Sequence, residues 1–343
     1  MTALTRRGLL VGACAAGLVS TLQACSAPAA PSGGPAPAGW SFTDDRGTQV
    51  SLKAQPRRIV AYDLAASPLM NIGVRPVGIF GSFPLDKSPQ LAGLDLNGIA
   101  RVGEAYGKLN LETLAAAQPD LIVSIFDPRL AGPVIGFPDQ ATQAQVEQLA
   151  PVLAINSIND LPHVIERFEQ LGQALGVDLS ASDAASNQQQ FEAASTRVQA
   201  TTAAKPELTA LAVAPYGGVG FAFARPDLNP TLRFYESLGL KMAKPTSPPA
   251  DINTDYNGFF YEQASFELAG KYPADLLLYD VLPGALDLGT LATIPTWEQL
   301  PAVQAGQLLP WRVLDSFAYK LLDADLGALA DAIERATVVT GHG

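Results

Sequence analysis

Residues 111–127 read LETLAAAQPDLIVSIFD, and residues 266–280 read FELAGKYPADLLLYD. Each stretch starts with a short helical pattern, passes through Pro and Asp, and ends in an apolar run closed by an aromatic residue and Asp. A helix followed by a short apolar strand is part of the β–α–β unit from which parallel sheets are built. The same unit in both halves of the chain predicts two similar α/β lobes.

The alternation of apolar runs and helical patterns extends outward from both stretches. In the first half we expect strands at 59–62, 77–80, 121–126 and 152–155, and helices at 66–72, 111–118 and 144–149. In the second half we expect strands at 208–214, 276–279 and 307–310, and helices at 233–238, 266–269, 297–305 and 326–336. This rhythm is typical of mainly parallel sheets covered by helices. We therefore predict two Rossmann-like α/β lobes.

The segment between the two halves carries no strand pattern. Residues 161–175 carry one apolar stripe at helical spacing, formed by Leu161, Val164, Ile165, Phe168, Leu171 and Leu175. Residues 182–203 are rich in Ala and Gln and permit helix over about six turns. We expect one long helix to join a first lobe at 40–160, through a helical connection at 161–204, to a second lobe at 205–343.

The N-terminus has the features of an export signal. Arg6 and Arg7 precede an uncharged apolar stretch, residues 8–22, that is too short to cross the ~30 Å hydrocarbon core of a bilayer. The sequence LQAC at 22–25 resembles the lipobox of bacterial lipoproteins. We predict a signal peptide at 1–24, a lipidated Cys25 and a flexible Pro/Ala/Gly/Ser tether to residue 39. A secretory peptide with an incidental cysteine is the alternative, and twin-arginine or general secretory export both stay open.

Composition excludes several classes of function. The 343 residues include 22 Lys+Arg against 33 Asp+Glu, which gives a formal net charge of −11. Nucleic acid is not expected as a partner, because no basic surplus exists to neutralise phosphates. The only histidines are His163 and His342, and the only cysteines are Cys14 and Cys25. These counts argue against a zinc hydrolase, a Ser-His-Asp enzyme and a disulfide scaffold, so we expect no catalytic residues, cofactor or metal site.

Ligands of open α/β sheets bind beyond the carboxyl ends of the strands, and here those ends are rich in aromatic residues. The expected ligand-binding residues come from both lobes and are Tyr62, Phe80, Tyr106, Phe126, Arg129, Tyr216, Arg225, Tyr279, Trp311, Arg312 and Tyr319. Aromatic rings supply rigid apolar area, and arginine supplies donors for an anionic or oxygen-rich ligand. Core packing is the alternative for Phe80, and helix capping is the alternative for the aspartates that follow strands, Asp63, Asp127 and Asp280.

Five fragments, in the same order along the chain, resemble the sequences of a known family. They are FTDDRGTQVSL at 42–52, PRRIVAYD at 56–63, GVRPVGIFG at 73–81, VGEAYGKLNLETLAAAQPDLIVS at 102–124 and WEQLPAVQAGQLLPW at 297–311. Together they resemble the iron-siderophore substrate-binding lipoproteins of ABC importers, the class that contains ferrichrome-, ferric-citrate- and cobalamin-binding proteins. The resemblance spans about 42–336 and implies the class III periplasmic-binding-protein fold, with two α/β lobes bridged by one long helix and the ligand in a shallow cleft.

The resemblance also implies a function. It describes a monomeric, non-enzymatic protein, lipid-anchored to the outer face of the cytoplasmic membrane, that captures a ferric siderophore and delivers it to an ABC permease and ATPase. Arg129, Arg225 and Arg312 would then balance the charge of an anionic chelate. Haem or a corrinoid in the same cleft, with Tyr106 or Tyr279 on the haem iron, is one alternative. A lipoprotein enzyme acting on the chelator, and a scaffold or sensor lipoprotein, are the others.

One departure from the family concerns docking to the permease. Members commonly use a glutamate on each lobe for this contact, and a gapless alignment places Ser67 and Arg233 at those positions. Asp63 or Glu236 are the alternatives within the chain. The resemblance therefore does not imply the usual docking contact.

Overall fold

A computed structural model describes residues 39–181, 183–217, 220–312 and 317–341. The chain divides into two units, Met1–Ala38 and Gly39–Gly343, and the described residues all belong to the second unit. The predicted signal peptide, the lipidated Cys25 and the tether up to Ala38 lie outside the described residues. No helix in the described ranges combines the length and apolar character needed to cross a membrane.

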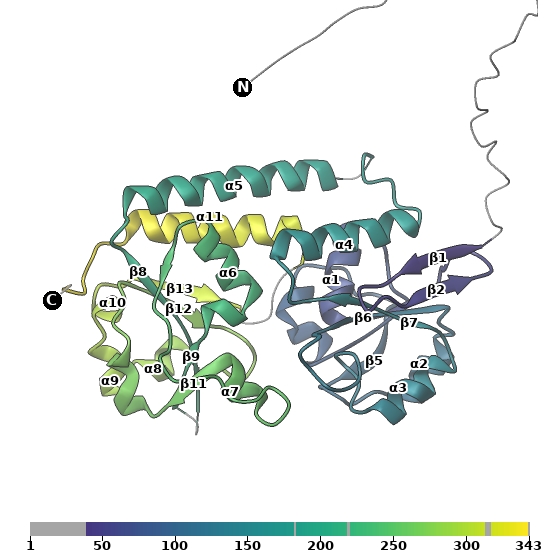
Figure 1. Cartoon of the computed structure of the whole chain (residues 1–343), viewed down its shortest axis with the longest axis horizontal. Coiled ribbons are helices and arrows are strands. Elements are labelled where there is room, and N and C mark those ends of the chain that lie inside the picture. The colour runs from purple at the N-terminus through teal and green to yellow at the C-terminus, as the bar shows by residue number, and fades with distance from the viewer. Residues whose placement is uncertain (1–38, 182, 218–219, 313–316, 342–343) are drawn as a thin grey trace, which may run out of the picture. The chain divides into compact units, whose positions relative to one another are not determined.

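The first lobe is built on a five-stranded parallel sheet in the order β5-β4-β3-β6-β7. Its strands are β3 (Ile59–Tyr62), β4 (Gly78–Gly81), β5 (Ala100–Glu104), β6 (Leu121–Phe126) and β7 (Val152–Asn156). Its helices are α1 (Asp63–Asn71), η1 (Leu85–Lys87), η2 (Pro89–Leu91), α2 (Leu111–Ala116), α3 (Gln140–Glu147) and α4 (Leu161–Ala174). Figure 1 shows α1 and α4 on one side of the sheet and α2 and α3 on the other. The central strands are nearly continuously apolar because both faces are covered. An antiparallel hairpin, β1 (Trp40–Thr43) and β2 (Gln49–Leu52), precedes the sheet.

The second lobe is built on a mixed six-stranded sheet. Its main path is β11-β9-β8-β12-β13, and β10 pairs with β8. The strands are β8 (Thr209–Tyr216), β9 (Gly220–Ala224), β10 (Lys241–Met242), β11 (Tyr261–Ala264), β12 (Leu276–Asp280) and β13 (Leu308–Trp311). The helices are η3 (Pro226–Leu228), α6 (Pro230–Ser237), α7 (Tyr256–Phe260), η4 (Phe266–Lys271), α8 (Leu288–Leu291), α9 (Pro295–Glu298), α10 (Pro301–Gln304) and α11 (Tyr319–Arg335). Only β9 and β11 run antiparallel to their neighbours.

The repeated sequence stretches occupy equivalent places in the two sheets. Strand β6 pairs with β3 on one side and β7 on the other, and β12 pairs with β8 and β13 in the same manner. The helical part differs, since α2 is an α-helix whereas η4 is a 3₁₀ helix. Both strands end in an aromatic residue and Asp at the same edge of their sheets, as the repeat predicts.

The helical connection consists of two helices. Helix α4 carries the predicted buried stripe and packs against α1, β1 and β7 of the first lobe. It ends before Gly176, whose φ of +87° is left-handed and whose Cβ would lie 2.5 Å from Gln55 Nε2. The long helix is α5 (Ala184–Ala204), and it lies along α11 of the second lobe (Figure 1). Gly176 thus separates the two helices at the boundary between the helical patterns predicted at 161–175 and 182–203.

The lobes share hydrophobic core at this connection. Phe168 of α4 stacks on Phe317, with ring centroids 6.1 Å apart, just before α11 begins. Phe191 of α5 contacts Phe234 of α6 and Tyr319 of α11. Burial of these rings joins both lobes to the helical layer behind them.

Candidate functional site

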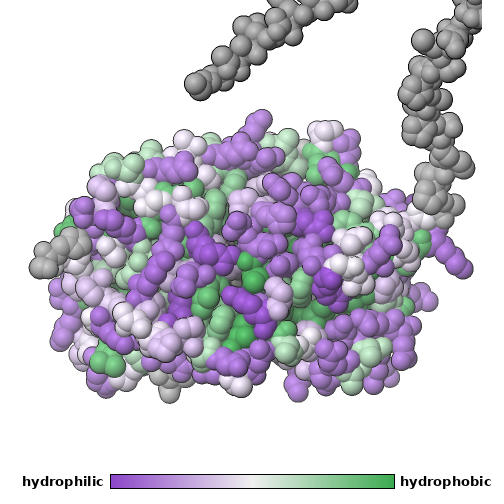
Figure 2. Space-filling model, viewed as in Figure 1, coloured by the Kyte–Doolittle hydropathy of each residue, from purple (hydrophilic) through white to green (hydrophobic). Residues whose placement is uncertain are grey.

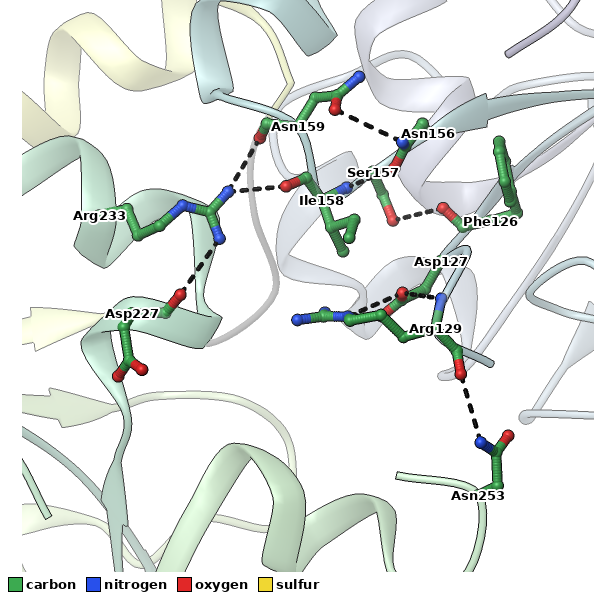
Figure 3. A network of polar contacts seen from close by, with 10 residues as sticks. All are labelled: Phe126, Asp127, Arg129, Asn156, Ser157, Ile158, Asn159, Asp227, Arg233 and Asn253. Atoms are coloured by element: carbon green, nitrogen blue, oxygen red, sulfur yellow. Dashed lines mark hydrogen bonds and ion pairs between the residues drawn. The ribbon is translucent and has the colours of Figure 1, made fainter. Parts of the chain in front are cut away.

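The carboxyl end of the first sheet meets the second lobe at Asn253, in the loop before α7. The Asn253 Oδ1 accepts a hydrogen bond from the Ala131 amide at 2.6 Å, and its Nδ2 donates to the Arg129 carbonyl at 3.3 Å. Figure 3 shows this contact between the loop that follows β6 and the segment that leads to α7. On the second-lobe side this contact comes from the segment before α7, which leads into the amino end of β11.

Arg129 lies at the centre of this contact. Its Nε and Nη2 donate to the Asp127 carboxylate at 2.9 and 2.7 Å, and its guanidinium lies 5.1 and 5.2 Å from the ring centroids of Phe259 and Phe260. The two rings belong to α7, so the guanidinium of one lobe packs against aromatic faces of the other. Arg129 keeps a partly exposed side chain, and its Nη1 makes no hydrogen bond within the described ranges. One donor nitrogen is therefore available to a ligand.

Tyrosines flank the arginine on both lobes. Tyr106 follows β5 and is 57% exposed, and Tyr256 at the start of α7 is 50% exposed. Tyr62, at the end of β3, is buried and shares a 2.7 Å hydrogen bond with Ser82 Oγ. Burial and the neighbouring Asp63 carboxylate raise the pKa of Tyr62, and the phenols of Tyr106 and Tyr256 add smaller contributions to this rise.

Helix α7 presents a compact aromatic face. The ring of Phe260 lies 4.8 Å from Tyr256 and 5.1 Å from Phe259, measured between centroids. Asp255 caps the helix by accepting a hydrogen bond from the Gly258 amide at 2.8 Å. Figure 2 shows apolar side chains at the surface in the middle of this face of the molecule. We call the surface formed by Tyr106, Arg129, Tyr256, Phe259 and Phe260 the aromatic–arginine surface.

A second contact joins the lobes through Arg233 of α6. Its Nη2 donates to the carbonyl oxygens of Ile158 at 2.7 Å and Asn159 at 3.3 Å, just after β7 of the first lobe (Figure 3). Its Nη1 donates to the Asp227 carbonyl at 3.5 Å within its own lobe. Arg233 therefore bridges the lobes through main-chain acceptors.

The other predicted residues of the first lobe lie beneath this surface. Phe80 is buried and packs against Tyr62 and Phe137, with centroids 5.5 Å away in each pair. Phe126 is half-buried, and its carbonyl accepts a hydrogen bond from the Ser157 amide at 3.0 Å. Both side chains support the loops that carry Tyr106 and Arg129.

Arg225 lies inside the second lobe. Its Nη1 donates to the Ser247 carbonyl at 2.6 Å, and its Nη2 reaches Ser247 Oγ and the Pro248 carbonyl. Its Nε has no partner among the described residues. Glu262 holds the same loop by accepting from the Ser247 amide and from Tyr272, and Lys271 pairs with its carboxylate. Arg225 is therefore a buried residue that holds the loop before α7 through hydrogen bonds, and its side chain is away from solvent.

Tyr216 and Tyr279 stand at the end of the second sheet. The Tyr216 hydroxyl donates to Asp280 Oδ2 at 2.5 Å, and burial together with this carboxylate raises the pKa of Tyr216 well above its usual value. Tyr279 is half-buried, and burial also raises its pKa. No hydrogen bond or ring contact in the described ranges joins either phenol to the aromatic–arginine surface.

Trp311 and Arg312 line a separate cavity of about 180 Å³ in the second lobe, together with Tyr235 and Leu322. Arg312 donates to Asp325 at 2.6 Å, and Trp311 is buried with no acceptor for its indole N–H among the described residues. Tyr319 is buried against Phe191, and burial with nearby glutamates raises its pKa to about 12. These three residues lie on the side of α11, not beside α7.

Sequence reasoning missed Tyr256, Phe259 and Phe260. The segment YNGFFY at 256–261 has a high density of aromatic residues, which is the one signal that could have identified it. It follows no strand pattern, so the rule that ligands bind at strand ends did not lead there.

Two α/β lobes with strand ends facing each other in front of a helical connection define a two-lobed binding protein. A family model described as "Periplasmic binding protein" matches residues 100–312. The chain belongs to this family of extracytoplasmic binding proteins, and it is a binding protein rather than an enzyme.

Solved structures support this assignment. The chain is similar to DesE, a ferric-siderophore receptor protein from Streptomyces coelicolor, with 30% identity over 88% of this chain and 100% of that chain and a TM-score of 0.77. It shares the fold of SirA from Staphylococcus aureus, solved with staphyloferrin B (20% identity, 87% and 99% covered, TM-score 0.59). It also shares the fold of FhuD from Vibrio cholerae, solved with Fe3+-Desferal (21% identity, 82% and 99% covered, TM-score 0.57). No curated protein matches the chain.

Proposed function

We propose that the protein captures a ferric siderophore on the aromatic–arginine surface and delivers it to an ABC permease. The observation that carries the proposal is the packing of Arg129 of one lobe against the rings of α7 of the other. The 30% identity to a ferric-siderophore receptor over the full length of that chain supports it.

The chemistry of the surface suits a metal chelate. The chelator fills the coordination sphere of ferric iron, so the protein has to recognise the outside of the complex. Aromatic rings from both lobes cover its apolar parts, and the Arg129 Nη1 donates to an oxygen atom of the chelator. No group of three or more His, Cys, Asp or Glu side chains in the described ranges could hold a metal ion.

We place the protein outside the cytoplasm, anchored through Cys25 to the outer face of the cytoplasmic membrane. The lipobox-like LQAC at 22–25 supports this part of the proposal. Cys25→Ala should release the protein from the membrane fraction without changing chelate affinity, because the tether separates the anchor from the lobes. Finding the variant still in the membrane fraction would contradict the anchor.

Delivery to the permease requires docking groups other than the two aligned residues. Ser67 is buried, and its hydroxyl donates to the Gln90 carbonyl at 2.7 Å. Arg233 is used in the contact between the lobes. We propose that other surface side chains dock the permease.

The experiment is a calorimetric titration of the native protein, Tyr106→Ala and Tyr256→Ala with a panel of hydroxamate, catecholate and carboxylate ferric chelates. Each variant should bind the preferred chelate about 1–2 kcal/mol more weakly, because one aromatic contact is lost. Leu149→Ala and Leu268→Ala are matched controls, since these side chains are 46% and 51% exposed, one in each lobe.

Two results would overturn the proposal. If both tyrosine variants bind with native affinity, the aromatic–arginine surface does not hold the ligand. If the native protein binds none of the ferric chelates, a ferric siderophore is not its ligand. A haem titration tests the alternative. A visible absorption band that disappears in Tyr106→Phe would identify a tyrosine-ligated haem instead.

A further inference from the structure

Asp127 forms an ion pair with the arginine of the aromatic–arginine surface. It follows β6 directly and is 5% exposed. Its two oxygens accept from Nε, Nη2 and the main-chain amide of Arg129. A paired geometry of this kind balances the guanidinium charge at contact distance while leaving Nη1 free to donate.

Two further carboxylates belong to the second-lobe segment that contacts Arg129. Asp255 caps α7, whose rings cover the guanidinium. Asp251 accepts from the Asn253 amide at 2.8 Å, and Asn253 itself bonds the Arg129 carbonyl. Asp127 is therefore the carboxylate in direct contact with this guanidinium, and Asp251 and Asp255 belong to the second-lobe segment that adjoins it.

The remaining cations near the sheet edge do not reverse this balance. Arg225 is buried in the second lobe, and Arg312 is paired with Asp325. Arg233 directs its donors to main-chain carbonyls at the other interlobe contact. Lys87 and Lys108 are exposed, where water and salt screen an ammonium group.

We propose that Asp127 is a specificity-determining residue that makes the site accept neutral or cationic ferric chelates and reject anionic ones. The inference rests on the proposed function. Three hydroxamates balance the charge of ferric iron, whereas three catecholates leave a net negative complex. A neutral trihydroxamate complex can accept a hydrogen bond from the Arg129 Nη1 without adding charge. A tricatecholate complex would place its negative charge beside the Asp127 carboxylate, which is unfavourable.

The test compares one ferric trihydroxamate with one ferric tricatecholate, at low and high salt, on the native protein and Asp127→Asn. The native protein should prefer the trihydroxamate. Asp127→Asn should gain roughly tenfold or more in tricatecholate affinity at low salt, less at high salt, and change little toward the trihydroxamate. Asp139→Asn is the control, because Asp139 is an exposed cap of α3 in the same lobe and asparagine also caps well.

Two more variants keep the test decisive. Asp127→Asn combined with Arg129→Gln removes both charges and should return selectivity toward the native ratio. Asp255→Asn preserves the cap of α7 and should shift selectivity in the same direction by a smaller factor, even if Asp127→Asn does not fold. An unchanged ratio of affinities in folded Asp127→Asn, or equal native affinity for both chelates, would overturn the inference. If the native protein binds neither chelate, the proposed function fails and this inference fails with it.

Discussion

Arg225 carries a formal charge that the surrounding lobe satisfies with carbonyl and hydroxyl oxygens. Its guanidinium bonds Ser247 and Pro248 in the loop before α7. Removing it leaves these part-buried acceptors without their donor, which costs more than the loss of a surface charge. We therefore expect Arg225 to contribute mainly to the stability of the fold and less to ligand affinity.

We accordingly expect Arg225→Ala to lower the free energy of unfolding by about 2–4 kcal/mol in urea denaturation. Arg225→Lys should recover only part of the loss, because a single ammonium cannot reach the same set of oxygens. Chelate affinity of the folded variant should stay within a few-fold of the native value. Native stability combined with lost affinity would instead make Arg225 a ligand contact.

Asp63 allows a pH prediction at the same scale. It is the first residue of α1, and burial raises its pKa to about 6, against hydrogen bonds from Ser88 Oγ and the Leu64 amide that lower it. The pKa of Asp63 is higher in the folded protein than in the unfolded chain. Its carboxyl group therefore makes its whole contribution to the free energy of unfolding below about pH 4, and this contribution is lost as the pH rises through about 6. Asp63→Asn removes this pH-dependent loss of stability, because asparagine carries no titratable carboxyl group.

The stability of Asp63→Asn relative to the native protein should therefore rise by about 2–3 kcal/mol between pH 4 and pH 7, measured by urea denaturation at each pH. The exposed Asp95→Asn is the control and should show no such trend. Parallel stability profiles for native protein and Asp63→Asn would show that this carboxyl does not titrate in the expected window.

The loop between β6 and α3 is the element that positions the first-lobe side of the site. Gly136 in this loop has a φ of +98°, and its Cβ would lie 2.6 Å from Phe80 Cε2 and 2.7 Å from Tyr62 Cδ2. Its backbone also hydrogen-bonds Tyr106, which lowers the pKa of that phenol against the rise that burial causes. A side chain here would strain the backbone and separate the loop from the rings below it.

Gly136→Ala should thus destabilise the protein by about 1–3 kcal/mol and weaken chelate binding, because Tyr106 loses its support. Gly132→Ala is a matched control in the same loop, where a Cβ meets nothing within 4 Å. Thermal melts and calorimetric titrations of both variants measure the two effects. Equal behaviour of the two variants would show that the close packing at Gly136 is not required.

The elements also show what the sequence could predict. The central strands β3, β6, β8 and β12 have long apolar runs, because helices cover both faces, and their positions were predicted. The hairpin β1–β2 and the strands β5, β9, β10 and β11 were missed, since strands of two to five residues show little periodicity.

The site also has features that the sequence could predict and features that it could not. Arg129 was predicted because it follows the strand predicted at 121–126, and the general rule for α/β sheets leads to such positions. Tyr106 was predicted from the glycine-bounded loop 102–107, although strand β5 before it was missed. The pairing of Arg129 with Asp127, and its packing on Phe259 and Phe260, depend on how the second lobe meets the first. No periodicity in 243–260 indicates that contact, so only the three-dimensional structure reveals it.

At the scale of the whole molecule, the lobes meet through a shared core at the helical layer and through two polar contacts in front of it. Arg233→Ala removes one polar contact and leaves the core intact. The lobes should then sample wider separations, which reduces the population competent to bind with both lobes.

Small-angle scattering of ligand-free Arg233→Ala should give a larger radius of gyration than that of the native protein, and chelate affinity should fall several-fold. Arg197→Ala is the control, because Arg197 pairs with Asp331 and Glu334 between α5 and α11 and touches neither interlobe contact. Identical scattering and affinity for native protein and Arg233→Ala would mean that the shared core alone sets the lobe arrangement.

The acceptors of Arg233 have a genetic consequence. They are peptide carbonyls, and every amino acid supplies one, so substitutions at 158 and 159 leave the acceptor atoms in place. The donor, by contrast, depends on one codon. Random mutagenesis should therefore recover changes in lobe opening at position 233 far more often than at its two partner positions. Substitutions can therefore change this interlobe contact only at position 233, and a single substitution at that position changes the contact without disturbing the first lobe.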